Sequence, residues 1–577
     1  MKDLMVIWNT LSRRQIYSQV GTNPNGDKLV EQDETRTLAD LQGRSSVVVN
    51  KFFNATVHSD GRRRWSKNTF MLMILGLCSL ASGCFILLCH PYEMIFKWKV
   101  SFSEGGETFE LWRKPPVDLY VKIYLFNVTN RDEYLKGEES KIRFQEVGPY
   151  VYKESFEHAD VIFNENGTLS AIPVHPLKYV PEMSNGTEED LVIMPNIALF
   201  SITNVMKDAA YLTRWGLNTL IRQTDTRPLV QMTAREFMFG YQSTLVTLGN
   251  HLMPSWIHFD KLGLIDRMYD FDGDSETIYT GETDIRMTGL IDTYNGDVNL
   301  SQWTGKCANV QGASDGAKFP SYIQPNDTLL FFRKSLCRSA RLVRIGEQVI
   351  ESLDTYKYTF RENELDNGAV NPENKCFCRQ GRCLQAGLID VTDCYYGFPI
   401  ALSYPHFYKS DPSLLEAVDG LNPKKELHES YFYIQPKSGL PVKLASRFQI
   451  NMALQDIGHM ARVEKFPGLT IPMLWFEIGM YKLPTVMKTR FWFYLNFMPV
   501  AEEAIMYLLF ISGIVLFIWS IMRILTGQTK KSSLELLEMK KKKQKMQTNK
   551  QIDSKEKETD VYNTLLSSNN PNLTLIV

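Results

Sequence analysis

Apolar positions are gathered into two uninterrupted runs, one near each end of the chain. The first, Thr69–Cys89, contains no charged residue and is long enough as a helix to cross a hydrocarbon core of about 30 Å. The second, Ala504–Met522, is also uncharged. A cleaved signal peptide is the alternative for the first run, but a signal peptide begins with a short polar segment, and here a long one comes first. We therefore predict two transmembrane helices, at residues 69–89 and 504–525.

Basic residues flank the two runs on the sides that face the chain ends. They precede the first run and follow the second: Arg62, Arg63, Arg64, Lys67, Arg523, Lys530 and Lys531. Because basic flanks favour the cytosolic side of a membrane, residues 1–68 and 526–577 are predicted to be cytosolic tails. Residues 90–503 then form a lumenal or extracellular domain. The N-terminal tail is polar, and we predict that it is mostly disordered.

Three small residues fall on one helical face of the first run: Gly76, Ser79 and Gly83. Small residues let two helix backbones approach closely within a membrane. The neighbouring helix is either the second run or a second subunit, so the sequence leaves a homo-oligomer open.

Between the runs, most apolar positions follow an extended pattern. Asp118–Val128 is rich in aromatic and β-branched residues with partial alternation, which predicts a strand, and Val147–Tyr152 predicts a turn that enters another strand. Further runs of this kind are Lys357–Phe360, Ser430–Gln435, Leu444–Met452 and Leu469–Phe476. Strands and helices do not alternate, so we predict an α+β ectodomain with a large antiparallel β-core.

One region departs from this pattern. Met194–Thr224 carries apolar residues at helical spacing, Pro195 suits a helix start, and a further helical piece follows at Thr233–Tyr241. The helices either cover the β-core or form a helical head with apolar surface exposed for a lipid or a partner. Three cations of this region would bind an anionic head group: Arg214, Arg222 and Arg227.

Cysteine usage agrees with an oxidising compartment for the ectodomain. Of the nine cysteines, three lie in the first apolar run and six lie between the runs: Cys307, Cys337, Cys376, Cys378, Cys383 and Cys394. Six cysteines permit 15 disulfide connectivities, and spacing alone does not choose among them. A zinc site is the alternative, but Cys-x-Cys lacks the usual two-residue spacer. We predict disulfides, no metal site and no cofactor.

Five sequons for N-linked glycosylation lie in the predicted ectodomain, and each marks a surface position: Asn127, Asn166, Asn185, Asn299 and Asn326. The formal net charge of −1 gives no reason to expect a nucleic-acid partner.

Two short motifs bear on activity and on traffic. Gly312–Gly316 fits the G-x-S-x-G pattern of hydrolases, which requires a strand before it and a helix after it. Cys307–Gln311 is short for that strand and Ala317–Pro320 breaks any helix, so we predict no catalytic residues and no enzyme. In the C-terminal tail, Tyr562 and Leu565 fit the Tyr-x-x-apolar form of a sorting signal that an adaptor protein reads.

Seven short motifs occur in order between the runs: Asn127–Thr129, Glu146–Tyr150, Asp292–Gly296, Leu336–Ser339, Cys376–Cys378, Pro405–Phe407 and Asp419–Pro423. Together they make the chain resemble the class B scavenger receptor family. The resemblance implies an antiparallel β-barrel capped by a helical head, with an internal lipid tunnel that leads toward the membrane. It also implies three disulfides: Cys307–Cys376, Cys337–Cys394 and Cys378–Cys383.

The resemblance also implies a function. A member of this family would bind lipoproteins, lipids or anionic cell debris and move lipid through its ectodomain, at the plasma membrane and with an endosomal or lysosomal pool. The alternative is a lysosomal cargo-sorting receptor that binds a protein through the helical head.

Overall fold

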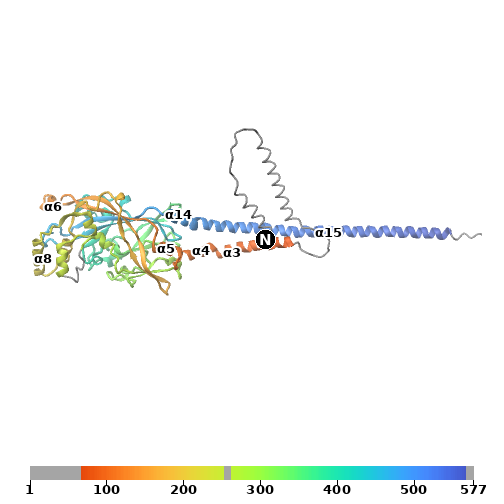
Figure 1. The fold of residues 1–577 in the computed structure, drawn as a ribbon, viewed down its shortest axis with the longest axis horizontal. Helices are drawn as coiled ribbons and strands as arrows, with labels where there is room; N and C mark the ends of the chain where they lie inside the picture. Colours follow the sequence, from red (N-terminus) through yellow and green to blue (C-terminus); the bar gives the residue numbers. More distant parts are fainter. Residues whose placement is uncertain (1–66, 253–260, 567–577) are drawn as a thin grey trace, which may run out of the picture. The chain divides into compact units, whose positions relative to one another are not determined.

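A computed structural model describes residues 67–252 and 261–566 (Figure 1). Of the predicted N-terminal tail, residues 1–66 lie outside the described residues. The chain divides into two compact units, residues 1–87 with 505–577, and residues 88–504.

The first unit contains most of the two predicted spans. Helix α3 (Lys67–Cys89) includes the first apolar run, and α15 (Met498–Leu566) includes the second. Both are long and apolar enough to cross a membrane. Helix α15 continues through the predicted C-terminal tail, so Tyr562 and Leu565 lie on helical backbone near its end.

Glycines bring the two spans together within one chain. A Cβ atom on Gly76 would lie 3.2 Å from the carbonyl oxygen of Gly513, and one on Gly513 would lie 2.7 Å from Leu80 Cγ. The hydroxyl groups of Ser79 and Ser512 are 3.0 Å apart. The small face of α3 therefore packs against α15, which is the first of the two neighbours that the sequence left open.

This packing predicts a cross-link. In a background where Cys78, Cys84 and Cys89 are alanine, we expect Ser79→Cys with Ser512→Cys to form an intramolecular disulfide, because the two hydroxyls are in contact. A protease site inserted at the exposed turn at Gly296 precedes all three native disulfides, so only the new bond would hold the two fragments together in denaturing, non-reducing gels.

Two comparisons sharpen this experiment. Leu77 and Val515 point away from the interface, so Leu77→Cys with Val515→Cys should not cross-link within the chain. Adding Gly76→Leu should suppress the Ser79–Ser512 cross-link because a side chain at position 76 meets α15 backbone. Equal cross-linking of all three variants would contradict the packing.

The second unit is built on one large sheet of twelve strands. Its strands are β1 (Leu119–Val128), β2 (Ile142–Glu154), β5 (Leu177–Tyr179), β10 (Leu329–Arg333), β11 (Arg338–Ile350), β12 (Leu353–Phe360), β13 (Ile389–Asp390), β14 (Ile400–Ser403), β15 (Val418–Asp419), β16 (Tyr431–Ile434), β17 (Pro441–Ala453) and β18 (Thr470–Met480). The main path runs β10-β11-β12-β16-β17-β18-β1-β2-β15, and every pair is antiparallel except β2 with β15. Strand β18 is buried along its whole length, and its sequence is mostly apolar. Its one charged residue, Glu477, forms an ion pair with Arg447 on β17.

The large sheet is open. Within the described residues its path ends at β10 on one side and at β15 on the other, and these two strands do not pair. The closed barrel that the resemblance implies is therefore not found in the strand pairing.

Of the turn and the strand predicted at Val147–Tyr152, the strand is confirmed and the turn is wrong. Strand β2 runs through it, and the irregularity is a β-bulge opposite Ile123–Leu125. Gly148 has a φ of 115°, and a Cβ atom there would lie 2.8 Å from the carbonyl oxygen of Ile123. Only glycine fits this close approach, so the Gly-Pro pair marks a bulge inside a strand.

Two smaller sheets complete the strand structure. One has the order β3-β4-β8-β9 and the other pairs β6 with β7. Their strands are β3 (Glu157–Phe163), β4 (Thr168–Val174), β6 (Leu191–Pro195), β7 (Leu229–Thr233), β8 (Glu276–Tyr279) and β9 (Ile291–Tyr294). Pro195 ends β6 and does not start a helix. Helix α7 begins two residues later, at Ile197, and the side chain of its N-cap Asn196 accepts a hydrogen bond from the Leu199 amide.

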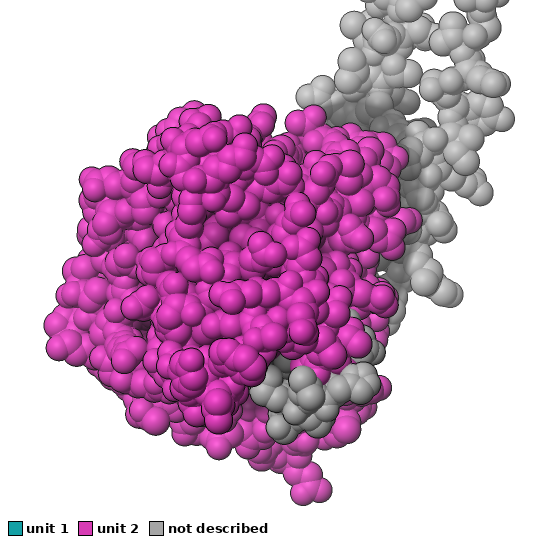
Figure 2. Space-filling view, turned by 90° about the vertical axis from the view of Figure 1, so that its left-hand side faces the viewer, with its two compact units in different colours: residues 1–87, 505–577 teal, residues 88–504 magenta. Residues whose placement is uncertain are grey.

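The head helices divide the two predicted roles between them. Helix α7 (Ile197–Met206) is buried from Ile197 to Asn204, whereas α8 (Tyr211–Gln223) buries only Leu217 and Ile221. The predicted third piece is α9 (Ala234–Phe239), which begins with a capping box. The end of the unit that carries α6 and α8 in Figure 1 faces the viewer in Figure 2, where residues 88–504 form one continuous surface.

The remaining α-helices of this unit are short: α4 (Pro91–Val100), α5 (Glu107–Arg113), α6 (Arg131–Lys136), α10 (Thr244–Leu252), α11 (Leu264–Met268), α12 (Pro412–Glu416), α13 (Lys425–His428) and α14 (Thr485–Trp492).

Candidate functional site: a cavity beside a buried ion pair

An apolar cavity of about 90 Å³ lies against the large sheet. Its apolar walls come from five strands of that sheet, through Leu119, Phe331, Phe432, Leu444, Ile478 and Met480. Because β10, at one end of the strand path, and β1, near the other end, line the same cavity, the sheet must curl around it.

An ion pair joins β10, at one end of the strand path, to β2, which is next to the other end. Arg333 is the last residue of β10 and Glu154 is the last residue of β2, and Arg333 Nη2 lies 3.3 Å from Glu154 Oε1. At this point the backbone of β2 pairs with β5 and not with β10. We call the gap between β10 and β2, which no backbone hydrogen bond between described residues closes, the seam. Side chains hold it together.

Glu154 has two further partners. His175 Nδ1 donates to Glu154 Oε1 at 2.6 Å, and the Tyr269 hydroxyl donates to Glu154 Oε2 at 3.0 Å. The His175 ring is stacked between Phe156 and Phe271, with ring centroids 4.5 and 4.3 Å away. We call Glu154, Arg333, His175 and Tyr269 the seam network.

The seam network keeps the buried carboxylate charged. Burial by itself would raise the pKa of Glu154, but Arg333, His175 and Tyr269 outweigh it and lower the pKa to about 2. For His175, burial outweighs the attraction of Glu154 and lowers the pKa of the imidazole. The cavity thus combines hydrocarbon walls with a polar wall in which Arg333 and Glu154 are paired with each other.

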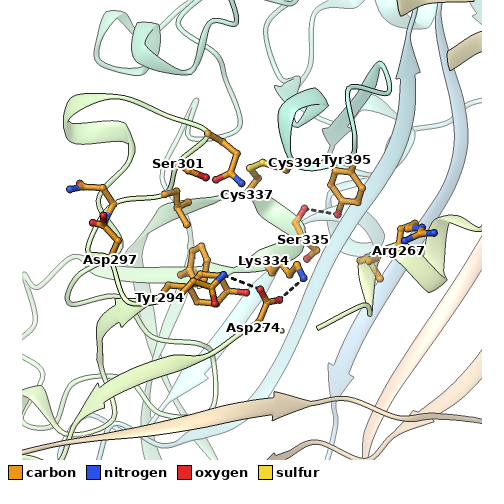
Figure 3. Close-up of a pocket in the computed structure, with 16 residues that line it drawn as sticks. Arg267, Asp274, Tyr294, Asp297, Ser301, Lys334, Ser335, Cys337, Cys394 and Tyr395 are labelled. Atoms are coloured by element: carbon orange, nitrogen blue, oxygen red, sulfur yellow. Dashed lines mark hydrogen bonds and ion pairs between the residues drawn. A yellow bond between two sulfur atoms is a disulfide. The ribbon is translucent and has the colours of Figure 1, made fainter. Parts of the chain in front are cut away.

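A second pocket, of about 310 Å³, is polar (Figure 3). Asp274 accepts a hydrogen bond from Asn295 Nδ2 at 3.0 Å and forms an ion pair with Lys334, and the Tyr395 hydroxyl donates to the carbonyl of Ser335 (Figure 3). Asn299, a predicted glycosylation position, is part of the lining. This pocket suits a polar ligand, and the cavity beside the seam network suits an apolar one.

The six ectodomain cysteines are joined in pairs. The pairs are Cys307–Cys376, Cys337–Cys394 and Cys378–Cys383, as the resemblance implies. The second pair forms part of the wall of the polar pocket (Figure 3).

The predicted glycosylation positions are not equivalent. Asn166, Asn185, Asn299 and Asn326 are exposed. Asn127 lies within β1, is half-buried, and accepts a hydrogen bond from the Ile193 amide through Oδ1 at 2.8 Å. Glycosylation at Asn127 therefore stays a prediction, and the side chain of Asn127 is less accessible than those of the other four asparagines.

The three predicted head-group arginines do not form one cluster. Arg222 and Arg227 are exposed, and Arg227 lies 3.6 Å from Asp225. Arg214 is half-buried and its Nη1 is 3.4 Å from the carbonyl oxygen of Lys207.

The G-x-S-x-G segment has a structural role. Ser314 is buried, and its hydroxyl donates to the carbonyl oxygen of Lys318 at 2.6 Å. Sequence reasoning missed the seam network because its four members are far apart in the chain and follow no spacing.

Comparison with known proteins identifies the family of the chain. The family model described as the CD36 family matches residues 71–524. The chain belongs to the CD36 family. It is 31% identical to scavenger receptor class B member 1 of Cricetulus griseus over 420 residues, which cover 72% of this chain and 81% of that protein.

Other relatives have different names. Protein peste of Drosophila melanogaster is 29% identical, with 70% of this chain and 74% of that protein covered. Lysosome membrane protein 2 of Mus musculus is 30% identical, with 70% and 84% covered. Two of these three relatives are thus named as a receptor and as a membrane protein. The family match includes the cavity, the disulfides and both candidate spans, but Tyr562 and Leu565 lie beyond it.

The seam network predicts a large effect of one substitution. We expect Arg333→Met to lower the free energy of unfolding by about 3–5 kcal/mol, because Glu154 stays buried without its cation. Lys114→Met, which breaks the exposed pair with Glu157, should have a much smaller effect because solvent screens that pair. Thermal unfolding of the detergent-solubilised protein compares the two.

The same network predicts an acid dependence. The pKa of Glu154, lowered to about 2, lies below the unfolded value of about 4.3. Its ionised form therefore contributes stability that is complete above about pH 4.3 and is lost as the pH falls toward 2. The stabilities of wild type and Glu154→Gln should converge over that interval, whereas a constant difference would contradict the assignment.

Proposed function

We propose that this protein is a receptor that binds lipids, lipoproteins or anionic cell debris at its helical head and moves lipid through its ectodomain toward the membrane. Membership of the CD36 family supports a receptor, and the apolar cavity against the curled sheet is the observation that favours lipid as its ligand. The plasma membrane, with an endosomal or lysosomal pool, is the proposed location.

Helix α8 is the proposed capture surface. Its outer face exposes three large side chains, Tyr211 at 72%, Leu212 at 77% and Trp215 at 61%. Exposed aromatic and aliphatic side chains side by side mark interaction surfaces. Arg222 lies farther along the same helix and is exposed, so hydrocarbon and anionic groups of one particle could both be bound.

The cavity is the proposed lipid-holding part. Its volume of about 90 Å³ is below the roughly 300–1,000 Å³ of typical ligand pockets, so an acyl chain must displace wall residues. Met480 and Met487 are in the lining, and methionine side chains adapt their shape easily. We propose that the tunnel forms when these side chains move.

A cargo-sorting receptor that binds a protein is the second candidate. One reason to consider it is the similarity to a relative named lysosome membrane protein 2. A second reason is that the apolar outer face of α8 would suit a protein surface as well as a lipid. The Tyr562–Leu565 motif, read by an adaptor protein, would serve either function.

The capture surface gives a charge-reversal prediction. Arg222→Glu with Arg227→Glu should weaken binding of anionic phospholipid particles to cells and reduce its salt dependence. Each exposed charge contributes only about 0–1 kcal/mol, but contacts add up on a multivalent particle. Lys114→Glu with Arg286→Glu makes the same change of net charge at exposed positions outside the head and should bind normally. Equal binding by both variants at low salt would exclude α8 as the capture site.

The cavity gives a prediction about uptake. Val117→Phe places an aromatic ring in the cavity lining and should reduce uptake of a fluorescent long-chain fatty acid at equal surface abundance, with particle binding unchanged. Val370→Phe makes the same change at an exposed position and should have no effect. Normal uptake by Val117→Phe would count against lipid passage through the cavity and favour the cargo receptor.

A further inference from the structure

Three side chains from separate segments meet beside the cavity: His158 and Glu276, which are buried, and Asp315, which is partly buried. One ligand atom from each lies within 4.8 Å of the other two. In the part of the chain that the structure describes, His158 Nε2, Glu276 Oε2 and Asp315 Oδ2 are buried and have no hydrogen-bond partner. We call these residues the His–Glu–Asp cluster.

Strand register explains why two members converge. His158 on β3 is opposite Pro173 on β4, and Glu276 on β8 is opposite Ala171 on β4. Pro173 and Ala171 are two residues apart and therefore share a face of β4, so His158 and Glu276 project from the same face of the sheet. Asp315 reaches them from the segment between β9 and β10.

Two members are oriented with a free lone pair toward the centre of the cluster. His158 Nδ1 is 3.1 Å from the carbonyl oxygen of Trp112, which can only accept, so Nδ1 carries a proton. The ring also stacks on Trp112, with centroids 3.6 Å apart. A backbone carbonyl that holds one ring nitrogen is the usual support of a metal-binding histidine. Asp315 Oδ1 accepts from the Ala317 amide at 2.8 Å, which leaves Oδ2 for the cluster.

The nearby cations already have partners. Arg333 is paired with Glu154, and Lys334 is paired with Asp274. Among the described residues, no lysine or arginine forms an ion pair with either carboxylate of the cluster. A buried carboxylate must be protonated, paired or bound to a metal, and two ionised ones together match the charge of a divalent cation.

The pKa of Glu276 agrees with a cluster whose negative charge is not balanced by a cation. Burial, reinforced by the carboxylates of Asp315 and Asp274, raises the pKa of Glu276 above its usual range. A proton or a cation would relieve this repulsion.

We propose that the His–Glu–Asp cluster binds a divalent transition-metal cation, with Zn²⁺ the best match. One imidazole nitrogen and two carboxylate oxygens are a zinc donor set, and three protein ligands leave a fourth position for water or an anionic group. His158 Nε2 and Asp315 Oδ2 are 3.4 Å apart, close to the roughly 3.4 Å edge of a tetrahedron with metal–ligand bonds of about 2.1 Å. The sequence predicted no metal because the ligands follow no motif.

The cation would connect the small sheet to the cavity wall. His158 and Glu276 belong to β3 and β8, whereas Asp315 also lines the apolar cavity. Zinc would therefore fix the segment that leads into β10, next to the seam network. This role does not depend on which ligand the receptor captures.

Metal analysis of the full-length protein in detergent, without a histidine tag, tests the site. After equilibration with Zn²⁺ and dialysis, we expect about one Zn²⁺ per wild-type chain and a loss of that ion in Glu276→Gln with Asp315→Asn. Asp272→Asn, an exposed acid in the nearby loop, is the matched control and should keep the ion. A chelator should lower the unfolding temperature of wild type and of the control, but not that of the double variant.

The opposite result has a distinct signature. If the two carboxylates share a proton, wild type retains no zinc, and neither zinc nor a chelator changes its unfolding temperature. The double amide variant would then unfold at a higher temperature than wild type, because it lacks the repulsion between the two buried carboxylates. Should the double variant fail to fold, wild type with Co²⁺ decides alone. A four-coordinate site gives strong visible absorption that Zn²⁺ abolishes, and its absence would overturn the proposal.

Discussion

The ion pair between Arg333 and Glu154 is the constraint on which the interior of the ectodomain depends. A twelve-stranded sheet with unpaired ends could flatten, and then no cavity would exist on its inner side. Burying a carboxylate is costly unless it is paired, so Glu154 stabilises the folded state only while Arg333, His175 and Tyr269 stay in place. One set of side chains thus fixes both the curvature of the sheet and the polar wall of the cavity.

The seam network and the His–Glu–Asp cluster are neighbours with opposite electrostatics. In the first, cations and donors surround a single carboxylate, whose pKa falls. In the second, carboxylates gather around Glu276, whose pKa rises. Asp315 and Glu154 both line the cavity, so the two groups border the same space.

Patterns that depend on neighbouring residues were readable from the sequence. The two apolar runs, the strand at Asp118–Val128 and the head helices all follow local patterns, and α3 and β1 lie within two residues of their predicted bounds. Helix α15, in contrast, extends to Leu566, far beyond the predicted span, and the predicted helical region at Met194–Thr224 contains the end of β6 and two separate helices. The Gly148–Pro149 pair was misread as a turn because a bulge uses the same residue types. The seam network was not predictable, since Glu154 and Arg333 meet only after the whole sheet has curled. Likewise, only three-dimensional contacts show that the small face of α3 packs against α15 and that its neighbour in the structure is the second span.

The separation between α7 and α8 has an evolutionary consequence. Helix α7 fills the core, and a substitution there would disturb the fold. The outer residues Tyr211, Leu212 and Trp215 of α8 make few buried contacts, so mutations at these positions change the surface with little effect on stability. Selection can therefore alter the exposed face of this helix while the scaffold is retained, and members of one family can come to present different surfaces through a handful of substitutions on a single helix.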